Sequence, residues 1–332
     1  MRSQPLLPSC WTHSMARIRA AVILGAGWSI PAGLPAAADL FTGGMQVTSK
    51  ASYRRLWLVQ SAYRRWAERQ SDPRAEIFLL ECYKRSYHPA PPWQHVVEYV
   101  QVRLSTPSIG DSRSFTSPRY GQRITHKTYY RRHEQFWLDL LARADVSGVI
   151  TTNYDFLIER SLRHRPMKRP PLPGCHYAGL PAVAAIGQAE PWTVHDRRDR
   201  VLLTGHIPLA KLHGSLNWTV TSGSSVVVYQ DARAAFRYGG TAAIVPPIPE
   251  KEPPAWLAPI WAAAEEILSQ ADIWVVVGYS LPSYDQAIRN LFRRAGQHLS
   301  TVELHDSYAA QLADRWKQLL PQVHVQLFSG IA

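Results

Sequence analysis

The sequence predicts an α/β fold, a doubly wound and mostly parallel sheet with an inserted helical subdomain. Short apolar runs typical of buried strands alternate with helical stretches near the start and again from residue 146 onward. Between these two parts the periodicity is helical only. The chain has 332 residues, of which 46% are hydrophobic, so it can bury a full core, and a disordered or collagen-like chain is excluded.

The first strand is expected at 20–24, an apolar run that Gly25 closes. A glycine loop follows, and Pro35 with the alanines after it opens a helix. The helical insertion is predicted to span 50–144. Its helices are expected over 53–69, 75–83, 94–104 and 129–144, with a long loop rich in Ser, Thr, Gly and Arg at 105–127.

From residue 146 the sequence predicts a strand at 146–152, a helix at 156–163 and an irregular, proline-rich insertion at 166–204. A strand at 210–212 and a hairpin around Ser222-Gly223-Ser224 come next. The last third alternates regularly. Its helices are expected over 257–270, 284–295 and 308–319, and its strands over 273–277, 302–304 and 324–328.

Residues 1–17 are predicted to be an N-terminal extension of a domain at 18–332, and Met15 is an alternative start. Residues 15–19 resemble the positively charged start of a signal peptide and precede the uncharged run 20–38. The glycines and prolines of this run instead favour a strand and a loop, and no membrane partner is expected. The three cysteines, Cys10, Cys82 and Cys175, lie far apart with no CxxC pair. A disulfide framework and a cysteine-rich zinc site are therefore not expected. We expect a reduced, cytoplasmic setting.

The net charge of +12 predicts attraction to polyanions without choosing among nucleic acid, a dinucleotide and a membrane surface. Paired arginines interleaved with Tyr and Trp in the helical block could bind nucleic acid or a partner protein, or could form a solvated face. These arginines are Arg54, Arg55, Arg64, Arg65, Arg131 and Arg132. A non-enzymatic binding module is thus one alternative, and a homo-oligomer is compatible with it.

Four features follow the ends of predicted strands: Gly25-Ala26-Gly27, Asn153 with Asp155, His213-Gly214-Ser215 and Gly278-Tyr279-Ser280. Carboxyl ends of parallel strands face one crevice, so we expect these features to converge on a ligand. Glycines after a strand let the backbone approach a pyrophosphate, although a tight structural turn also explains them. Asn153 and Asp155 could instead cap a helix, and His213 could be structural or a general base.

In this order, GAGWSIPAGLP, TTNYD, KLHGS and GYSLP resemble the sirtuin pattern of a GAG-x-S loop, a TQN-x-D strand end, an HG motif and a G-[TS]-S loop. The resemblance covers 18–35 and 145–332, and it leaves the helical block and the region 166–204 uncovered. It implies a Rossmann-like domain that binds and consumes NAD. By the same resemblance the catalytic residues are Asn153 and Asp155 beside the nicotinamide ribose and His213 as base, and the residues that bind the rest of NAD are Gly25, Ala26, Gly27, Ser29, Gly33, Gly278, Ser280 and Asp306.

Two departures from the sirtuin deacylases stand out. The chain cannot build their four-cysteine zinc module, and Ala36-Ala37-Ala38-Asp39 replaces their Asp-Phe-Arg after the glycine loop. It looks more like the zinc-less bacterial sirtuin-like NAD hydrolases, which are effectors of antiphage defence. This implies NAD as substrate, no zinc, and control by an activating partner protein or nucleic acid; NAD-dependent protein deacylation remains the alternative.

Cleavage of the nicotinamide–ribose bond passes through an oxocarbenium-like sugar, so the site must tolerate positive charge and deliver water. We assign Asn153 to orient water or ribose hydroxyls and His213 to accept a proton. A serine hydrolase is a further alternative, because Ser280, Asp306 and His324 follow the chain order of that fold. Its motif is broken by Pro282, which replaces a glycine.

Overall fold

The computed structural model describes residues 17–32, 34–35, 39–42, 50–86, 88–104, 115–116, 123–124, 126–162, 172–180, 206–222, 225–229, 235, 242–247 and 253–330. Its main sheet has seven strands, in chain order β1 (Ile18–Leu24), β4 (Ala144–Thr151), β5 (Cys175–Tyr177), β6 (Ile207–Lys211), β9 (Ile273–Val277), β10 (Thr301–His305) and β11 (His324–Phe328). Neighbours pair in parallel in the order β11-β10-β9-β1-β4-β6-β5. The predicted α/β class is confirmed.

The helices of the described part fall into two groups. Those of the α/β part are α1 (Ala26–Ser29), α5 (His126–Arg143), α6 (Leu157–Ser161), α8 (Ala258–Ser269), α9 (Gln286–Ala295) and α10 (Ala309–Leu319), with short 3-10 turns at Ile30–Ala32 and Ala255–Leu257. The helical block consists of α2 (Lys50–Ala67), α3 (Ala75–Lys84) and α4 (Trp93–Leu104). The described residues also form two small antiparallel pairs: β2 (Phe115–Thr116) with β3 (Arg123–Ile124), and β7 (Trp218–Val220) with β8 (Val226–Val228).

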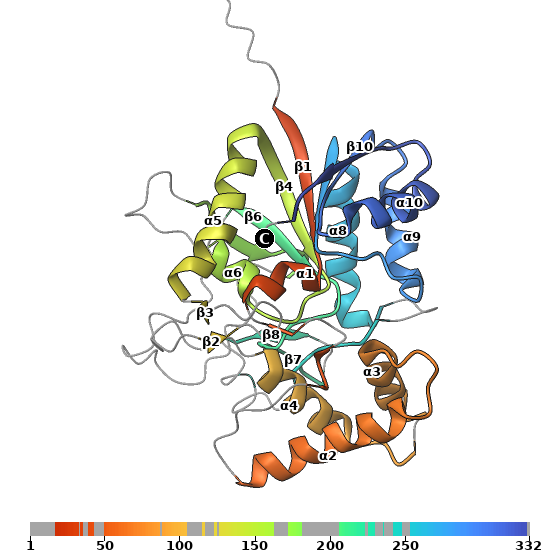
Figure 1. The fold of residues 1–332 in the computed structure, drawn as a ribbon. Coiled ribbons are helices and arrows are strands. Elements are labelled where there is room, and N and C mark those ends of the chain that lie inside the picture. Colours follow the sequence, from red (N-terminus) through yellow and green to blue (C-terminus); the bar gives the residue numbers. More distant parts are fainter. Residues whose placement is uncertain are drawn as a thin grey trace, which may run out of the picture.

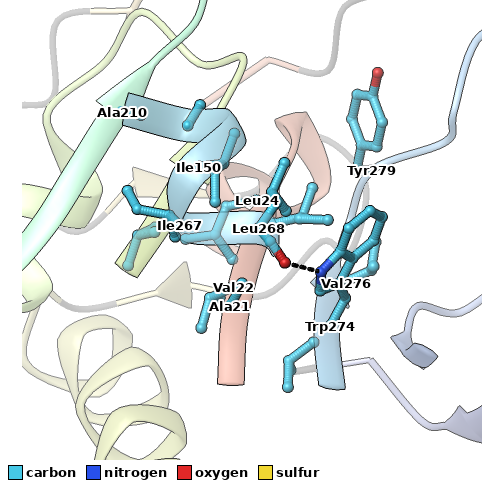
Figure 2. Close-up of a cluster of buried hydrophobic side chains, with 14 of the residues drawn as sticks. Ala21, Val22, Leu24, Ile150, Ala210, Ile267, Leu268, Trp274, Val276 and Tyr279 are labelled. Carbon is cyan, nitrogen blue, oxygen red and sulfur yellow. Dashed lines mark hydrogen bonds between the residues drawn. The ribbon is translucent and has the colours of Figure 1, made fainter. Parts of the chain in front are cut away.

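Figure 1 shows α5 and α6 on one side of strands β1, β4 and β6, and α8 on the other. Strands β1 and β9 lie at the centre of the sheet. Residues 20–24 of β1 and all of β9 form unbroken apolar runs, as expected of strands whose two faces are both covered. In Figure 2 the indole of Trp274 packs in this core and donates a hydrogen bond of 3.0 Å to the Leu268 carbonyl. A buried Trp with a satisfied N–H fixes α8 against the sheet.

The helical block has a core of its own. The ring of Phe41 stacks between Tyr63 of α2 and Tyr99 of α4, with centroids 4.8 and 5.0 Å away. Phe156 and Leu216, which follow strands of the sheet, are buried in the same cluster. The block is thereby anchored beyond the carboxyl ends of the strands, where Figure 1 shows α2, α3 and α4 below the sheet.

Helix α5 belongs to the other core, since its Trp137 and Leu140 are buried with the sheet residues. Among the described residues of 50–144, three helices share one core and a fourth covers the sheet. As a domain assignment, 50–144 stays a prediction, as does the extension at 1–17.

Several predicted elements need correction. The segment expected to be a glycine loop begins a short helix, α1, at Ala26. The region expected to be irregular, 166–204, contributes β5 to the sheet, where the Ala178 N–H donates to the Leu209 carbonyl at 2.9 Å. The three residues of β5 are too few to give a periodic signal. The helix expected after Pro35 involves residues outside those described.

Candidate functional site

A cavity of about 160 Å³ lies between the carboxyl edge of the sheet and the helical block. The α/β part contributes Ala26, Ser29, Thr152, Asn153, Tyr154, Asp155, His213, Gly278, Tyr279, Ser280, Tyr284 and Asp285 to its walls. Ala75, Glu76 and Leu79 of α3 and Leu104 of α4 close the opposite side. The predicted convergence is thus seen, with a wall from the insertion that the motifs did not reveal.

The glycines of the first and last motifs pack against each other. The Gly27 N–H donates to the Gly278 carbonyl at 2.9 Å, and Gly278 has φ +62. A Cβ on Gly27 would lie 2.5 Å from the Gly278 Cα, and one on Gly25 2.5 Å from its carbonyl oxygen. Glycine is required here because two backbones touch, which brings the β1–α1 turn and the β9 loop to one edge of the cavity.

A hydrogen-bonded network connects Asn153, Ser29 and Asp155. The Asn153 Nδ2 donates to the Gly25 carbonyl at 2.9 Å and to Ser29 Oγ at 3.1 Å. The Ser29 hydroxyl donates to Asp155 Oδ2 at 2.9 Å, and Asp155 Oδ1 accepts from the Leu157 N–H at 2.9 Å. Asp155 therefore accepts the first N–H of α6 from a position one residue before the N-cap, Phe156, and it also holds Ser29. Burial raises the pKa of its carboxyl, although Lys211 and these hydrogen bonds oppose the rise.

His213 follows β6 and is 4% exposed. Its Nε2 lies 3.5 Å from Asp285 Oδ2, and the Asp285 side chain is 2% exposed. The other oxygen of Asp285 accepts from the Ile288 N–H at 3.4 Å, which caps α9 and fixes the carboxylate. A carboxylate behind a histidine orients the ring and stabilises its protonated form, so this pair is suited to accept a proton.

A buried ion pair lies beneath the cavity floor. Lys211 Nζ is 3.0 Å from Glu159 Oε1, and both side chains are 0% exposed. The ammonium also donates to the Asp155 backbone carbonyl, and Glu159 accepts from the Tyr177 hydroxyl at 2.8 Å. Lys211 thereby ties the turn that carries Asn153 and Asp155 to strand β6 and helix α6.

The lining is acidic. Glu76, Asp155 and Asp285 contribute carboxyl groups, whereas no Lys or Arg is among the described lining residues. The Tyr284 hydroxyl is hydrogen-bonded to Glu76, and its pKa is raised by burial and by the Glu76 charge. The Arg74 guanidinium lies 5.5 Å above the Tyr284 ring and joins α3 to the same loop.

Of the residues assigned by sequence, Ala26, Ser29, Asn153, Asp155, His213, Gly278 and Ser280 line the cavity. Gly25 and Gly27 are not in the lining but pack against Gly278, which is, and Gly33 lies outside the described residues. Asp306 is not in the lining, and its carboxylate accepts from the Tyr308 N–H at 2.7 Å ahead of α10. Their roles toward a ligand remain predictions.

Sequence reasoning missed Asp285, Tyr284 and Glu76. Asp285 stands five residues after Ser280 and caps a helix. Its place at a helix start could be predicted from the sequence, but its pairing with His213 could not. Glu76 comes from the helical block, which carries no motif. Only the folded chain brings it to the cavity.

The serine hydrolase alternative is contradicted by the strand register. His324 pairs with Thr301 at the amino ends of β11 and β10, whereas Ser280 follows the carboxyl end of β9. Ser280 and His324 therefore lie toward opposite ends of the sheet. They cannot share a proton.

Among the described residues, no group of three or more His, Cys, Asp or Glu side chains is placed to hold a metal ion. No helix in these ranges has the length and apolar character needed to cross a membrane. Cys82 and Cys175 are buried free thiols.

Comparison with known proteins gives one family. Among solved structures, a mutant Sir2 homologue with 2′-O-acetyl ADP ribose is 16% identical, with a TM-score of 0.47, and the alignment covers 95% of this chain and 88% of that one. A Sir2 homologue–NAD complex is 14% identical, with a TM-score of 0.41 and coverage of 95% and 86%. No curated protein sequence matches the chain. The model of the SIR2-like domain matches residues 147–322, which is more than half of the chain. This part supplies Asn153, His213 and Ser280. The chain therefore belongs to the SIR2-like domain family.

Proposed function

We propose that this protein is a NAD glycohydrolase, which cleaves the nicotinamide–ribose bond with water to give nicotinamide and ADP-ribose. The observation that carries the proposal is the cavity itself. It brings Asn153, Ser29 and the His213–Asp285 pair together at the carboxyl edge of the sheet.

The charge of the cavity suits the proposed bond cleavage. Nicotinamide in NAD is cationic, and positive charge moves onto the ribose as the bond breaks. Glu76 and Asp285 face this space, and the described lining has no Lys or Arg. In a water-poor site, fixed negative groups stabilise developing positive charge more strongly than water does.

Each polar residue then has a defined task. Both hydrogen bonds of the Asn153 Nδ2 go to the protein, so its Oδ1 is the atom left to hold a ribose hydroxyl or the attacking water. His213 accepts the proton of that water, and Asp285 stabilises the imidazolium that results. Asp155 positions Ser29 and α6 through the hydrogen bonds described above.

The size of the cavity limits what it encloses. Sites for small molecules usually measure about 300–1,000 Å³, and this cavity measures about 160 Å³. It is therefore assigned to the nicotinamide and its ribose, while the adenosine half extends along Gly278 and Ser280 at the rim.

The biological setting follows from the resemblance to bacterial sirtuin-like NAD hydrolases. We propose an effector of antiphage defence that depletes NAD after a trigger, with the helical block available to a partner protein, nucleic acid or second copy. In infected cells, NAD is expected to fall with the wild-type protein but not with His213→Ala. Equal NAD levels in both would contradict this role.

The test of the activity is product analysis by chromatography, with NAD alone and with NAD plus an acetyl-lysine peptide. A hydrolase releases nicotinamide and ADP-ribose without peptide. Release that requires the peptide, with an acetylated ADP-ribose product, would establish the deacylase alternative instead. His324→Ala is the matched control for His213→Ala, because His324 is an exposed histidine at the amino end of its strand.

A further inference from the structure

Two arginines, Arg289 and Arg315, contact the loop that follows β9, and a third, Arg293, follows Arg289 on α9 and donates to the Asn290 Oδ1 at 2.8 Å. Arg289 and Arg293 are four residues apart on α9, so they lie on one face of that helix, and Arg315 comes from the neighbouring α10. The Arg315 Nη1 donates to the Ser280 carbonyl at 3.0 Å, and the Arg289 Nη1 to the Leu281 carbonyl at 3.5 Å. In Figure 1 both helices lie together in the blue part of the chain.

This cluster is not neutralised by the protein. Arg294 of the same helix pairs with Glu265 at 2.7 Å, and Arg143 pairs with Glu303 at 2.5 Å. Within the described ranges, no carboxylate forms an ion pair with Arg289, Arg293 or Arg315. Burial lowers the pKa of Arg289, and the positive charges of Arg293 and Arg315 lower it further. The guanidinium groups of Arg293 and Arg315 are therefore close enough to Arg289 to repel its charge.

The cluster lies next to a loop that lines the cavity. Ser280 lines the cavity, and its backbone carbonyl is held by Arg315. Carboxyl groups line the cavity, whereas the arginines stand outside the lining, where Arg315 and Arg289 donate to the Ser280 and Leu281 carbonyls. In a dinucleotide the cationic nicotinamide would face these carboxyl groups, and the negatively charged phosphates beyond it would face the arginines.

We propose that Arg289, Arg293 and Arg315 form an anion site at the cavity rim that binds a phosphoryl group of the dinucleotide. The inference rests on the proposed function for the identity of the ligand. The phosphoryl group has two sources, the pyrophosphate present in every dinucleotide and the 2′-phosphate of NADP. Planar guanidinium groups bind either one through paired, charge-assisted hydrogen bonds.

The test compares the double variant Arg293→Gln/Arg315→Gln with Lys317→Gln/Arg69→Gln. Both remove two positive charges from exposed positions, and Lys317 stands on α10 two residues from Arg315, on a different face. The ligands are inorganic pyrophosphate, nicotinamide riboside, NAD and NADP. Binding is measured by calorimetry at low and at physiological salt, with nicotinamide release followed in parallel.

The site variant is expected to bind pyrophosphate and NAD about tenfold more weakly at low salt, while nicotinamide riboside is unaffected and the control variant matches the wild type. The KM for NAD should rise with little change in kcat. A larger loss for NADP than for NAD identifies the 2′-phosphate as the source, and equal losses identify the pyrophosphate.

Two outcomes overturn the inference: wild-type protein that does not bind pyrophosphate at low salt, or a site variant that binds pyrophosphate and NAD as the wild type does. Failure of the proposed function is distinguishable. If no form releases nicotinamide but pyrophosphate binding is still lost in the site variant alone, the anion site stands and the hydrolase assignment falls.

Discussion

The buried pair of Lys211 and Glu159 makes a sharp prediction about stability. Their side chains are 0% exposed and their charged atoms are 3.0 Å apart. Replacing Lys211 by Met keeps the length of the side chain but leaves Glu159 as an uncompensated buried charge. It also removes the donor to the Asp155 carbonyl. Loss of one partner of a buried ion pair costs about 3–5 kcal/mol, and we expect Lys211→Met to lower the free energy of unfolding by that amount.

Removing both charges should cost less than removing one. In Lys211→Met/Glu159→Gln the amide still accepts from Tyr177, and no charge is left unpaired. We expect the double variant to be more stable than Lys211→Met by about 1–3 kcal/mol. Lys317→Met, a change of the same kind at an exposed position, should stay within about 0.5 kcal/mol of the wild type.

Urea unfolding followed by tryptophan fluorescence measures these differences, since the chain has 12 Trp residues. The reasoning would be refuted if Lys211→Met cost less than about 1 kcal/mol, or if the double variant lost the sum of the two single changes. Nicotinamide release gives a second readout. Lys211 holds the turn that carries Asn153 and Asp155, so kcat should fall in every variant that lacks its ammonium.

Three further predictions concern the loops and the sheet. Gly278→Ala should lower stability by more than about 1 kcal/mol, because its φ is +62 and its Cβ would meet Gly27 at 2.5 Å; an unchanged melting temperature would contradict this. Asp285→Asn keeps the cap of α9 but removes the charge beside His213, so nicotinamide release should fall at least about tenfold with an unchanged melting temperature, and an unchanged rate would count against the pair. Burial alone would raise the pKa of Glu303, but hydrogen bonds and charges of His305 and Arg143 hold it at about 2, below its ordinary 4.5. Its stabilising contribution is present above pH 4.5 and is lost as the pH falls toward 2. Glu303→Gln should therefore flatten the decline in melting temperature over this range, and parallel curves would contradict the assignment.

The central strands and the carboxyl-terminal third could be predicted from sequence because each element is long and regular. The strand at Ile273–Val277 was expected with the observed bounds, as was the one at His324–Phe328. Strand β5 could not be found, because only three residues form it and its pairing with β6 is set by the tertiary fold. Helix α1, at four residues, is equally short for a periodic pattern.

The site was predictable only in part, for a similar reason. Asn153, Asp155 and His213 stand at strand ends, and strand ends of a parallel sheet must meet. Asp285 and Glu76 carry no such signal, since a helix cap and a helical block have many positions that a carboxylate could occupy. The reason for the glycines could be seen only in the structure. Gly25 and Gly27 contact Gly278, which is a packing requirement between two distant segments that no local motif specifies.

The most direct test of the account is the rate of nicotinamide release from NAD by purified protein, without peptide. Wild type, Asn153→Ala, His213→Ala and the control His324→Ala are compared, with melting temperatures measured on the same samples. The account predicts nicotinamide and ADP-ribose in equal amounts from the wild type and from His324→Ala, and loss of at least about a hundredfold in the two cavity variants with folds intact. Wild-type rates in a folded His213→Ala would contradict the assignment of this cavity as the site of cleavage.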